Sequence, residues 1–430
     1  MKLKKILTYI SFPILFGIAG CFFLCLVSLI PDSAVYDNAL ISAQQLSGLG
    51  VYDVILDEND PSCTIDSSTD RQIIMESYTL SNKREYSFLL NPRYWIESDD
   101  NVSLFTDLLE GRAECNQNYL RYWMGFRILY RPLLVFTPYF GMLKLVGFLL
   151  CLSYAAAIAV VGEKAGIFPA IGLGVAVGLM NPGTIVHSLQ FSICFLMAAV
   201  FIILAVSLSV PRDKMPLLFC LFGIITQFMD FYTTPLLTFG FPILTVMCLK
   251  EYIGKRLSTL LMTFGAWLYG YVSMWLVKLA LVTGITGQQG FEDGFLSLAG
   301  RIGLIKVEGF EKYYDIKKAL ESVWWICCPG DNEKLVFLLI AALVICSGVM
   351  IFVRKGADAL LDDLSFLAAA IMPVIWFICA AQPTLIHFWF QYRSIAVFFA
   401  GVLLFLAEGI RCITPGKQPV VASGYPPLSL

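Results

Sequence analysis

The chain has 430 residues, of which 58% are hydrophobic and 14% are charged, and its net charge is -2. Soluble domains carry about 25% charged residues, so this composition cannot cover a water-exposed surface. The small negative charge argues against a nucleic-acid partner, and two histidines in the whole chain argue against a histidine-based metal centre.

The apolar segments predict an all-α fold, that of a polytopic integral membrane protein with about ten transmembrane helices. A helix needs about 20 apolar residues to cross the hydrocarbon, where backbone groups must bond within the segment. The segments at 166–180 and 216–230 are short and are typical of broken or re-entrant helices. The predicted spans are 9–30, 140–161, 166–180, 190–210, 216–230, 233–249, 258–282, 335–353, 364–381 and 393–410.

Basic residues predict the orientation, because cytoplasmic loops are rich in Lys and Arg. The short outer loops of the resulting topology contain only Arg393. Both termini are therefore expected in the cytoplasm, and the long segments 31–139 and 283–334 outside. The basic residues assigned to the inner side are Lys2, Lys4, Lys5, Lys164, Arg212, Lys214, Lys250, Lys255, Arg256, Arg354, Lys355, Arg411 and Lys417.

This topology divides the chain into six parts. Residues 1–30 resemble a signal peptide but continue to Ile30 without a small-residue cleavage site, so a retained anchor is expected. The parts are the anchor span 1–30, an external cap with membrane-lying helices at 31–139, a transmembrane core at 140–282, a second external segment at 283–334, C-terminal spans at 335–410 and a disordered cytoplasmic tail at 411–430.

Within the cap, residues 33–56 predict a helix ending near 48–50, and Thr69 is a suitable N-cap for a second helix. A third helix is expected through 118–136, where Tyr119, Tyr122, Phe126 and Tyr130 have helical spacing with arginines among them, a composition suited to the headgroup level. Cys63 and Cys115 lie outside the spans; they form a disulfide in an oxidising exterior or remain free thiols.

Charged residues at membrane depth are expensive and indicate function. Asp230, with Thr233 and Thr234, predicts either a sugar-orienting site or a cap for the next helix. Lys278 ends an aromatic helix face and either binds a lipid phosphate or extends to the headgroups alone. Gly270 on the same helix predicts the close approach of another helix.

The outer loop before the last span contains His387 and Arg393 among aromatic residues, a pattern typical of an interface belt or of a binding site. A general base needs a carboxylate close to a membrane-bound donor. Asp32, Asp37 and Asp70 are the three external candidates. No Walker, HExxH, GxSxG, haem or iron–sulfur pattern occurs. No cofactor or metal ligand set is predicted, and a divalent cation at the carboxylates is left open.

Several stretches together resemble a poorly characterised family of bacterial multi-span membrane proteins, over residues 1–410 in order. In that family the position of Met124 is usually His, so any chemistry of that His is lost here. The stretches are Thr69-Asp70, Arg121-Tyr122-Trp123-x-Gly125, Arg131-Pro132, Asp230-Phe231-x-Thr233-Thr234-Pro235, Gly270-Tyr271-x-x-Met274-Trp275-x-x-Lys278 and His387-x-Trp389-Phe390-x-Tyr392-Arg393.

The layout is also similar to that of the GT-C membrane glycosyltransferases, which use polyprenyl-phosphate sugars and an acidic residue in or near the first external loop. Likeness of layout does not fix function. The resemblance implies transfer of a sugar from a lipid-phosphate donor to a glycan or lipid acceptor, at the outer face of the bacterial cytoplasmic membrane. The alternatives are a transporter or flippase of lipid-linked glycans and a non-catalytic envelope-polymer assembly factor.

In the transfer hypothesis each candidate residue has a role. Asp70, Asp37 or Asp32 deprotonates the acceptor. Basic residues hold the lipid phosphate as charge develops on it. The expected substrate-binding residues are Arg121, Trp123, Asp230, Thr233, Thr234, Lys278, His387 and Arg393.

Overall fold

The structure is a computed structural model that describes residues 3–80, 90, 93–94, 101–110, 112, 117–208, 210–305, 315–328, 330 and 332–413. Within these ranges the chain is almost entirely helical, apart from the paired two-residue strands β1 (Arg93–Tyr94) and β2 (Gln117–Asn118). Residues 414–430 of the predicted tail lie outside the described residues, as does Cys115. The proposed Cys63–Cys115 pair is therefore untested.

Seven of the described helical segments are long and apolar enough to cross a membrane, which confirms an all-helical protein with several candidate spans. Three further predicted spans correspond to shorter apolar helices, so the count of ten is not established. The seven are Leu7–Ser28, Tyr139–Lys164, Leu189–Ser207, Arg256–Thr286, Lys334–Lys355, Ala357–Cys379 and Phe388–Ile413, and the three are Ile167–Gly178, Met215–Met229 and Leu237–Met247.

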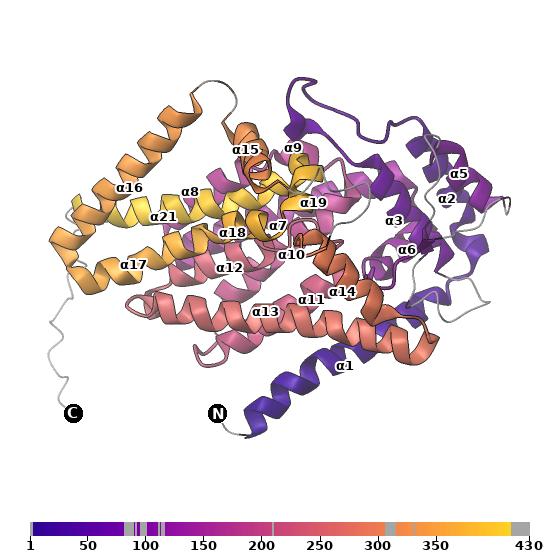
Figure 1. Ribbon diagram of the computed structural model, residues 1–430, viewed down its shortest axis with the longest axis horizontal. Helices are drawn as coiled ribbons and strands as arrows, with labels where there is room; N and C mark the ends of the chain where they lie inside the picture. The colour runs from indigo at the N-terminus through magenta and orange to yellow at the C-terminus, as the bar shows by residue number, and fades with distance from the viewer. Residues whose placement is uncertain are drawn as a thin grey trace, which may run out of the picture.

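The long helices run side by side, and the cap helices gather at one end of the bundle (Figure 1). The helices that build the bundle are α1 (Leu3–Ser28), α7 (Tyr139–Lys164), α8 (Ile167–Gly178), α10 (Leu189–Ser207), α11 (Met215–Met229), α12 (Leu237–Met247), α13 (Arg256–Leu281), α16 (Glu333–Lys355), α17 (Ala357–Ala370), α18 (Met372–Cys379) and α21 (Ala396–Ile413). The cap and the connecting segments contain α2 (Asp32–Ser47), α3 (Ser67–Thr79), α5 (Asn101–Leu109), α6 (Arg127–Phe136), α9 (Pro182–Ile185), α14 (Gly290–Arg301), α15 (Ile316–Cys327), α19 (Ala381–Ile386) and α20 (Phe388–Gln391).

Burial orders the bundle from centre to periphery. In the most apolar 18-residue stretch of α10, 78% is buried, whereas in that of α16 only 11% is buried. Helix α10 is therefore central, and α16 presents its side chains outward. Helices α11 and α13 pack closely because both carry glycine at the contact. A Cβ on Gly270 would overlap the Cys220 carbonyl, and one on Gly223 would overlap the Trp267 carbonyl. The predicted role of Gly270 is confirmed.

The cap agrees with the sequence in part. The helix predicted over 33–56 is α2, which ends at Ser47 with Gly48 as its C-cap. The Thr69 N-cap was wrong: Asp66 caps α3, and its carboxylate accepts a hydrogen bond from the Thr69 amide at 2.8 Å. Asp is a strong capping residue because its oxygens reach the free amides of the first turn.

The helix predicted through 118–136 was wrong in its first half. Met124 has a φ of 54°, a left-handed conformation that a continuous helix does not allow, and α6 begins only at Arg127. Gly125 lies against α11, where its amide donates to the Phe228 carbonyl at 2.9 Å and a Cβ would overlap Phe228. The loop before α6 is thus fixed in a non-helical path.

A buried ionic cluster joins the ends of α13, α16, α17 and α21. Arg256 is 2% exposed and pairs with Asp363, with Asp362 at 3.5 Å and with Glu408 at 3.3 Å. Lys355 lies 3.0 Å from Glu408. Buried charges require such partners, because an isolated charge in a low dielectric is very costly.

Cysteine labelling tests the predicted orientation, which length and composition leave open. We expect a membrane-impermeant maleimide to modify Glu58→Cys in intact cells and Ile253→Cys only after permeabilisation, since both positions are exposed and lie in segments assigned to opposite sides. Labelling of Ile253→Cys in intact cells would contradict the topology. The background lacks the exposed native thiols Cys25, Cys151, Cys346 and Cys379.

Arg256→Met tests the ionic cluster. Removal of one partner leaves buried carboxylates uncompensated, which costs about 3–5 kcal/mol, so we expect a clearly lower thermal unfolding temperature in detergent. Lys317→Met is the control, because Lys317 forms an exposed pair with Glu321 at 3.6 Å, and exposed pairs contribute about 0–1 kcal/mol. Equal unfolding temperatures for the two variants would contradict a stabilising cluster.

Candidate functional site

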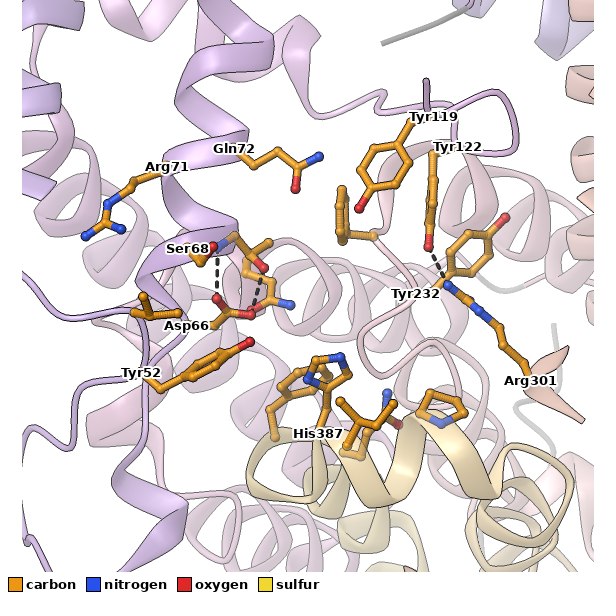
Figure 2. Close-up of a pocket in the computed structure, with 18 of the residues that line it drawn as sticks. Tyr52, Asp66, Ser68, Arg71, Gln72, Tyr119, Tyr122, Tyr232, Arg301 and His387 are labelled. Atoms are coloured by element: carbon orange, nitrogen blue, oxygen red, sulfur yellow. Dashed lines mark hydrogen bonds between the residues drawn. The ribbon is translucent and has the colours of Figure 1, made fainter. Parts of the chain in front are cut away.

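A polar cavity of about 630 Å³ lies where the cap meets the loop after α11, helix α14 and the segment α19–α20. Figure 2 shows part of its lining, drawn from segments far apart in the chain. The lining residues with polar or aromatic side chains are Tyr52, Asp66, Ser68, Thr69, Arg71, Gln72, Phe105, Tyr119, Arg121, Tyr122, Gln190, Phe231, Tyr232, Ser297, Arg301, Gln382, His387, Phe390 and Gln391.

One wall of the cavity combines arginines with stacked aromatic rings. The Tyr122 ring stacks on Phe231, with ring centroids 5.1 Å apart and an interplanar angle of 10°. The Arg301 guanidinium donates to the Tyr122 hydroxyl at 2.5 Å (Figure 2) and lies 5.6 Å from the Tyr232 ring centroid. Arg121 lies 5.0 Å from the centroid of the Tyr122 ring. The guanidinium groups of Arg301 and Arg121 therefore both lie close to the Tyr122 side chain.

The two arginines differ in their acidic partners. Arg121 pairs with Asp293 of α14 at 3.1 Å, whereas Arg301 has no carboxylate within 4.0 Å in the part of the chain that the structure describes. Burial raises the pKa of the Tyr122 phenol, but the positive charges of Arg301 and Arg121 outweigh burial and leave this pKa below its usual value. The wall thus presents an excess of positive charge.

The opposite wall contains a buried carboxylate at the start of α3. Asp66 is 3% exposed and accepts a second hydrogen bond from the Thr69 hydroxyl at 2.7 Å. Burial raises the pKa of Asp66, and the hydrogen bonds from Thr69 oppose this effect. A carboxylate whose pKa is raised is a stronger base than an ordinary aspartate.

His387, one of the predicted binding residues, lines the same cavity. Its ring lies against two aromatic neighbours, Phe390 with centroids 5.1 Å apart and Trp389 at 5.4 Å. Burial lowers the pKa of His387 to about 4, and the charge of Arg301 adds to this effect. The imidazole is therefore neutral at physiological pH and can donate or accept a hydrogen bond.

Several polar atoms around the cavity are buried without a hydrogen-bond partner. Buried polar groups in folded proteins are almost always paired, so a cluster of unpaired ones indicates that a polar ligand or water completes them. The atoms are Arg71 Nε and Nη1, Gln72 Nε2, Arg121 Nε, Gln190 Oε1, His387 Nδ1 and Gln391 Oε1.

Asp70 does not belong to the described lining of the cavity. It is 1% exposed, and its carboxylate accepts hydrogen bonds from the Tyr139 hydroxyl at 2.8 Å and from the Leu189 and Gln190 amides at 3.0 and 2.9 Å. These amides begin α10, where an anion is favoured by the helix dipole. Burial raises the pKa of Asp70 to about 7 against these hydrogen bonds. Asp70 therefore anchors α3 to the start of α10, away from the described lining of the cavity.

The other two predicted bases lie at the surface. Asp32 is half exposed and pairs with the Arg131 guanidinium at 3.0 Å, and Asp37 is exposed on α2. The described cavity lining includes neither of them. The structure thus gives no shared pocket to the three carboxylates.

The remaining predicted binding residues also lie apart from the cavity, with Asp230 in the turn that follows α11. The Asp230 carboxylate accepts hydrogen bonds from the Thr233 hydroxyl at 2.7 Å and the Thr233 amide at 3.1 Å. The Thr234 carbonyl accepts a hydrogen bond from Cys194. This geometry is that of an Asx turn. The helix cap expected as one alternative is wrong, because the N-cap of α12 is Leu236.

Lys278 and Trp123 meet beside α13. The Lys278 ammonium lies 5.3 Å from the Trp123 ring centroid and donates to the Leu90 carbonyl. Trp123 Nε1 donates to the Met274 carbonyl at 3.0 Å. Lys278 is 0% exposed, so it does not extend to the headgroups as the snorkelling alternative supposed.

Arg393 is a buried residue that binds three backbone carbonyls. It is 0% exposed and donates to the carbonyls of Met180 at 3.0 Å, Trp389 at 3.0 Å and Ser62 at 2.9 Å. These carbonyls belong to the turn after α8, to helix α20 and to the 3-10 helix η1 (Pro61–Cys63) of the cap. Arg393 therefore holds the cap to the spanning helices.

Of the predicted site residues, the structure brings Arg121 and His387 into one cavity, together with residues that the sequence did not single out. Asp66 was missed because Thr69 was taken as the cap; the spacing Asp-x-x-Thr was the available signal. Arg301 lies in the long segment predicted to be external, which has no motif, so the sequence offered no signal for it. Among the described residues, no group of three or more His, Cys, Asp or Glu side chains has a geometry that could hold a metal ion.

The chain was compared with protein-family models, curated proteins and solved structures, and none of them matches it. The assignment of function therefore depends on the geometry of this cavity.

Another buried carboxylate, that of Glu76 on α3, predicts how the stability of the protein depends on pH. Glu76 is 1% exposed with Arg127 at 4.0 Å. Burial raises its pKa to about 8, with Arg127 opposing. Because the folded state holds this proton more tightly, the free energy of unfolding should fall as pH rises from about 4.5 to about 8.

Glu76→Gln should remove that fall, which is on the order of a few kcal/mol, and leave a flatter curve of unfolding temperature against pH in detergent. Glu58→Gln, at an exposed position, is the control and should keep the wild-type slope. A Glu76→Gln curve parallel to the wild-type curve would contradict the assignment.

Proposed function

We propose that this protein transfers a sugar from a lipid-phosphate donor to the hydroxyl of a glycan or lipid acceptor, in the cavity between the cap and the spanning helices. The observation that carries the proposal is Arg301, a cation without a carboxylate partner in the described structure, placed beside Arg121 and across the cavity from the Asp66 carboxylate. Such a transfer requires a group that binds the phosphate of the donor and a base that takes the proton of the acceptor hydroxyl.

The charges of the cavity favour an anionic ligand. Arg71, Arg121 and Arg301 contribute three positive charges, and Asp66 with the Arg121 partner Asp293 contributes two negative charges, which leaves an excess of one positive charge. Guanidinium groups bind phosphate oxygens with paired N–H donors in a fixed plane. In a site of low dielectric such donors stabilise the charge that develops on a leaving phosphate.

The uncharged lining suits a sugar ring. Tyr52, Tyr119 and Tyr232 present aromatic surface, on which the apolar face of a pyranose can pack. Gln72, Gln190, Gln382 and Gln391 supply amide donors and acceptors for hydroxyl groups, and three of these side chains hold a buried atom without a partner. Polar groups that converge in a concave site are typical of small-molecule binding.

The transfer requires one bond to form and one to break. Asp66 takes the proton of the acceptor hydroxyl, the acceptor oxygen bonds to the anomeric carbon of the sugar, and the bond from that carbon to the phosphate oxygen breaks with its electron pair. The lipid phosphate that leaves is held by Arg121 and Arg301. Asp66 replaces Asp70, Asp37 and Asp32 in this role, because its carboxylate lies at the cavity and theirs do not.

Substitutions at the two walls test the proposal. Asp66→Asn keeps an oxygen that can cap α3 but removes the base, and Arg301→Gln removes the unpaired cation. We expect each to lower transfer about 10²–10³-fold, measured as envelope glycan composition at matched protein levels in the membrane. Wild-type glycans in both variants would end the transfer hypothesis.

Two further variants are matched controls. Asp37→Asn changes an exposed carboxylate of the cap and should leave glycans unchanged. Asp70→Asn should leave transfer per folded molecule unchanged but lower the unfolding temperature, because it weakens the hydrogen bonds at the start of α10. Loss of transfer in Asp70→Asn with an unchanged unfolding temperature would return the role of base to Asp70.

A further inference from the structure

Helix α14 has an exposed apolar face. Phe291, Phe295 and Leu298 follow the spacing i, i+4, i+7 and are 39%, 50% and 41% exposed. Leu304 and Ile305, just beyond the helix, are 74% and 41% exposed. An exposed apolar stripe on a helix that follows a spanning helix is typical of a segment lying in the membrane interface.

The opposite face of α14 closes the polar cavity. Ser297, Gly300 and Arg301 belong to the cavity lining, and Asp293 pairs with Arg121 of the facing loop at 3.1 Å. One helix therefore separates the cavity from the apolar surroundings. The wall between the two is a single helix thick.

The apolar face of α14 continues the outward surface of α13. Phe295 packs edge-on against Trp275, with ring centroids 5.4 Å apart. The glycines of α14 allow this approach: a Cβ on Gly294 would lie 2.8 Å from a Leu279 methyl group. Leu268 and Leu276 on α13 are 42% and 38% exposed. Because α13 is a candidate span, its outward surface faces hydrocarbon, and the face of α14 extends it.

The segments that flank α14 contain glycines at which the backbone can change direction. The chain leaves α13 through a π-helical turn, η3 (Val282–Thr286), and then through Gly287 at a φ of 71°. Beyond α14, Gly303 also has a φ of 71°. Glycine adopts this conformation without steric cost, and π-turns occur often at functional sites. Between these ends, α14 is held to the cavity by Arg121–Asp293 and Arg301–Tyr122.

We propose that α14 is a lid whose apolar face lies among the acyl chains of the membrane, so that the cavity opens sideways into the bilayer when the contacts of Arg121 and Arg301 are released. The partner of the exposed face is the hydrocarbon of one leaflet. The anionic group that enters is carried on a membrane lipid. This inference depends on the cavity and not on the transfer chemistry, which the glycan assay tests separately.

Spin labels test the position of the lid in lipid nanodiscs. A nitroxide at Phe295→Cys should be relaxed by oxygen more than by a water-soluble nickel chelate, as should one at Leu268→Cys on the exposed face of α13. A label at Lys317→Cys, in an exposed polar position, should show the reverse. If the Phe295→Cys label behaves like that at Lys317→Cys, the membrane partner is excluded.

Release of the lid is measured by the distance between labels at Leu298→Cys on α14 and Ile41→Cys on α2, two exposed positions. Otherwise wild-type protein should give one narrow distribution. Asp293→Asn with Tyr122→Phe removes the contacts that hold the lid and should add a longer, broader component. A distribution that stays narrow in this variant, with its labelled helices folded, would overturn the lid. Retained Phe295 accessibility with lost glycan transfer would separate the lid from the proposed chemistry.

Discussion

Arginine guanidinium groups bonded to backbone carbonyls hold the cap to the spanning helices. A carbonyl at the end of a helix has no partner of its own and cannot find one in hydrocarbon. Arg131 donates to the carbonyls of Ser77, Tyr78 and Ile30, and Arg393 donates to those of Met180, Trp389 and Ser62. These contacts pair backbone carbonyls with guanidinium donors and connect the cap to the candidate spanning helices.

Apolar length predicted most of the fold. The seven long helices and the three short ones all fall on segments expected to span, because backbone satisfaction in lipid leaves few alternatives to a helix. The loop before α6 was mispredicted because Tyr119, Tyr122 and Phe126 have helical spacing, while the packing of Gly125 on Phe228 fixes a different path. At that loop the tertiary contact overrides the local pattern. For a similar reason the sequence did not predict the residues at which each short helix begins and ends.

The candidate site was predicted less well, for a physical reason. A lone charged residue in an apolar chain has the same appearance in the sequence whether it binds a ligand or a carbonyl. Lys278, Arg393 and Asp230 all satisfy backbone or neighbouring groups away from the cavity, whereas Arg301 lines the cavity and donates to the Tyr122 hydroxyl. That distinction depends on the loops that converge in space, and neither composition nor spacing encodes it.

The ionic cluster around Arg256 has a consequence for how the two ends of the molecule respond to force. Helices α13, α16, α17 and α21 share charges at that end, so they shift there only as one body. Among the residues that the structure describes, the opposite end has separate ion pairs, Arg121–Asp293 and Arg131–Asp32, and no cluster shared by four helices. A movement that opens the cavity is therefore a movement of α14 and its flanking segments, while these four helices stay joined at their other ends.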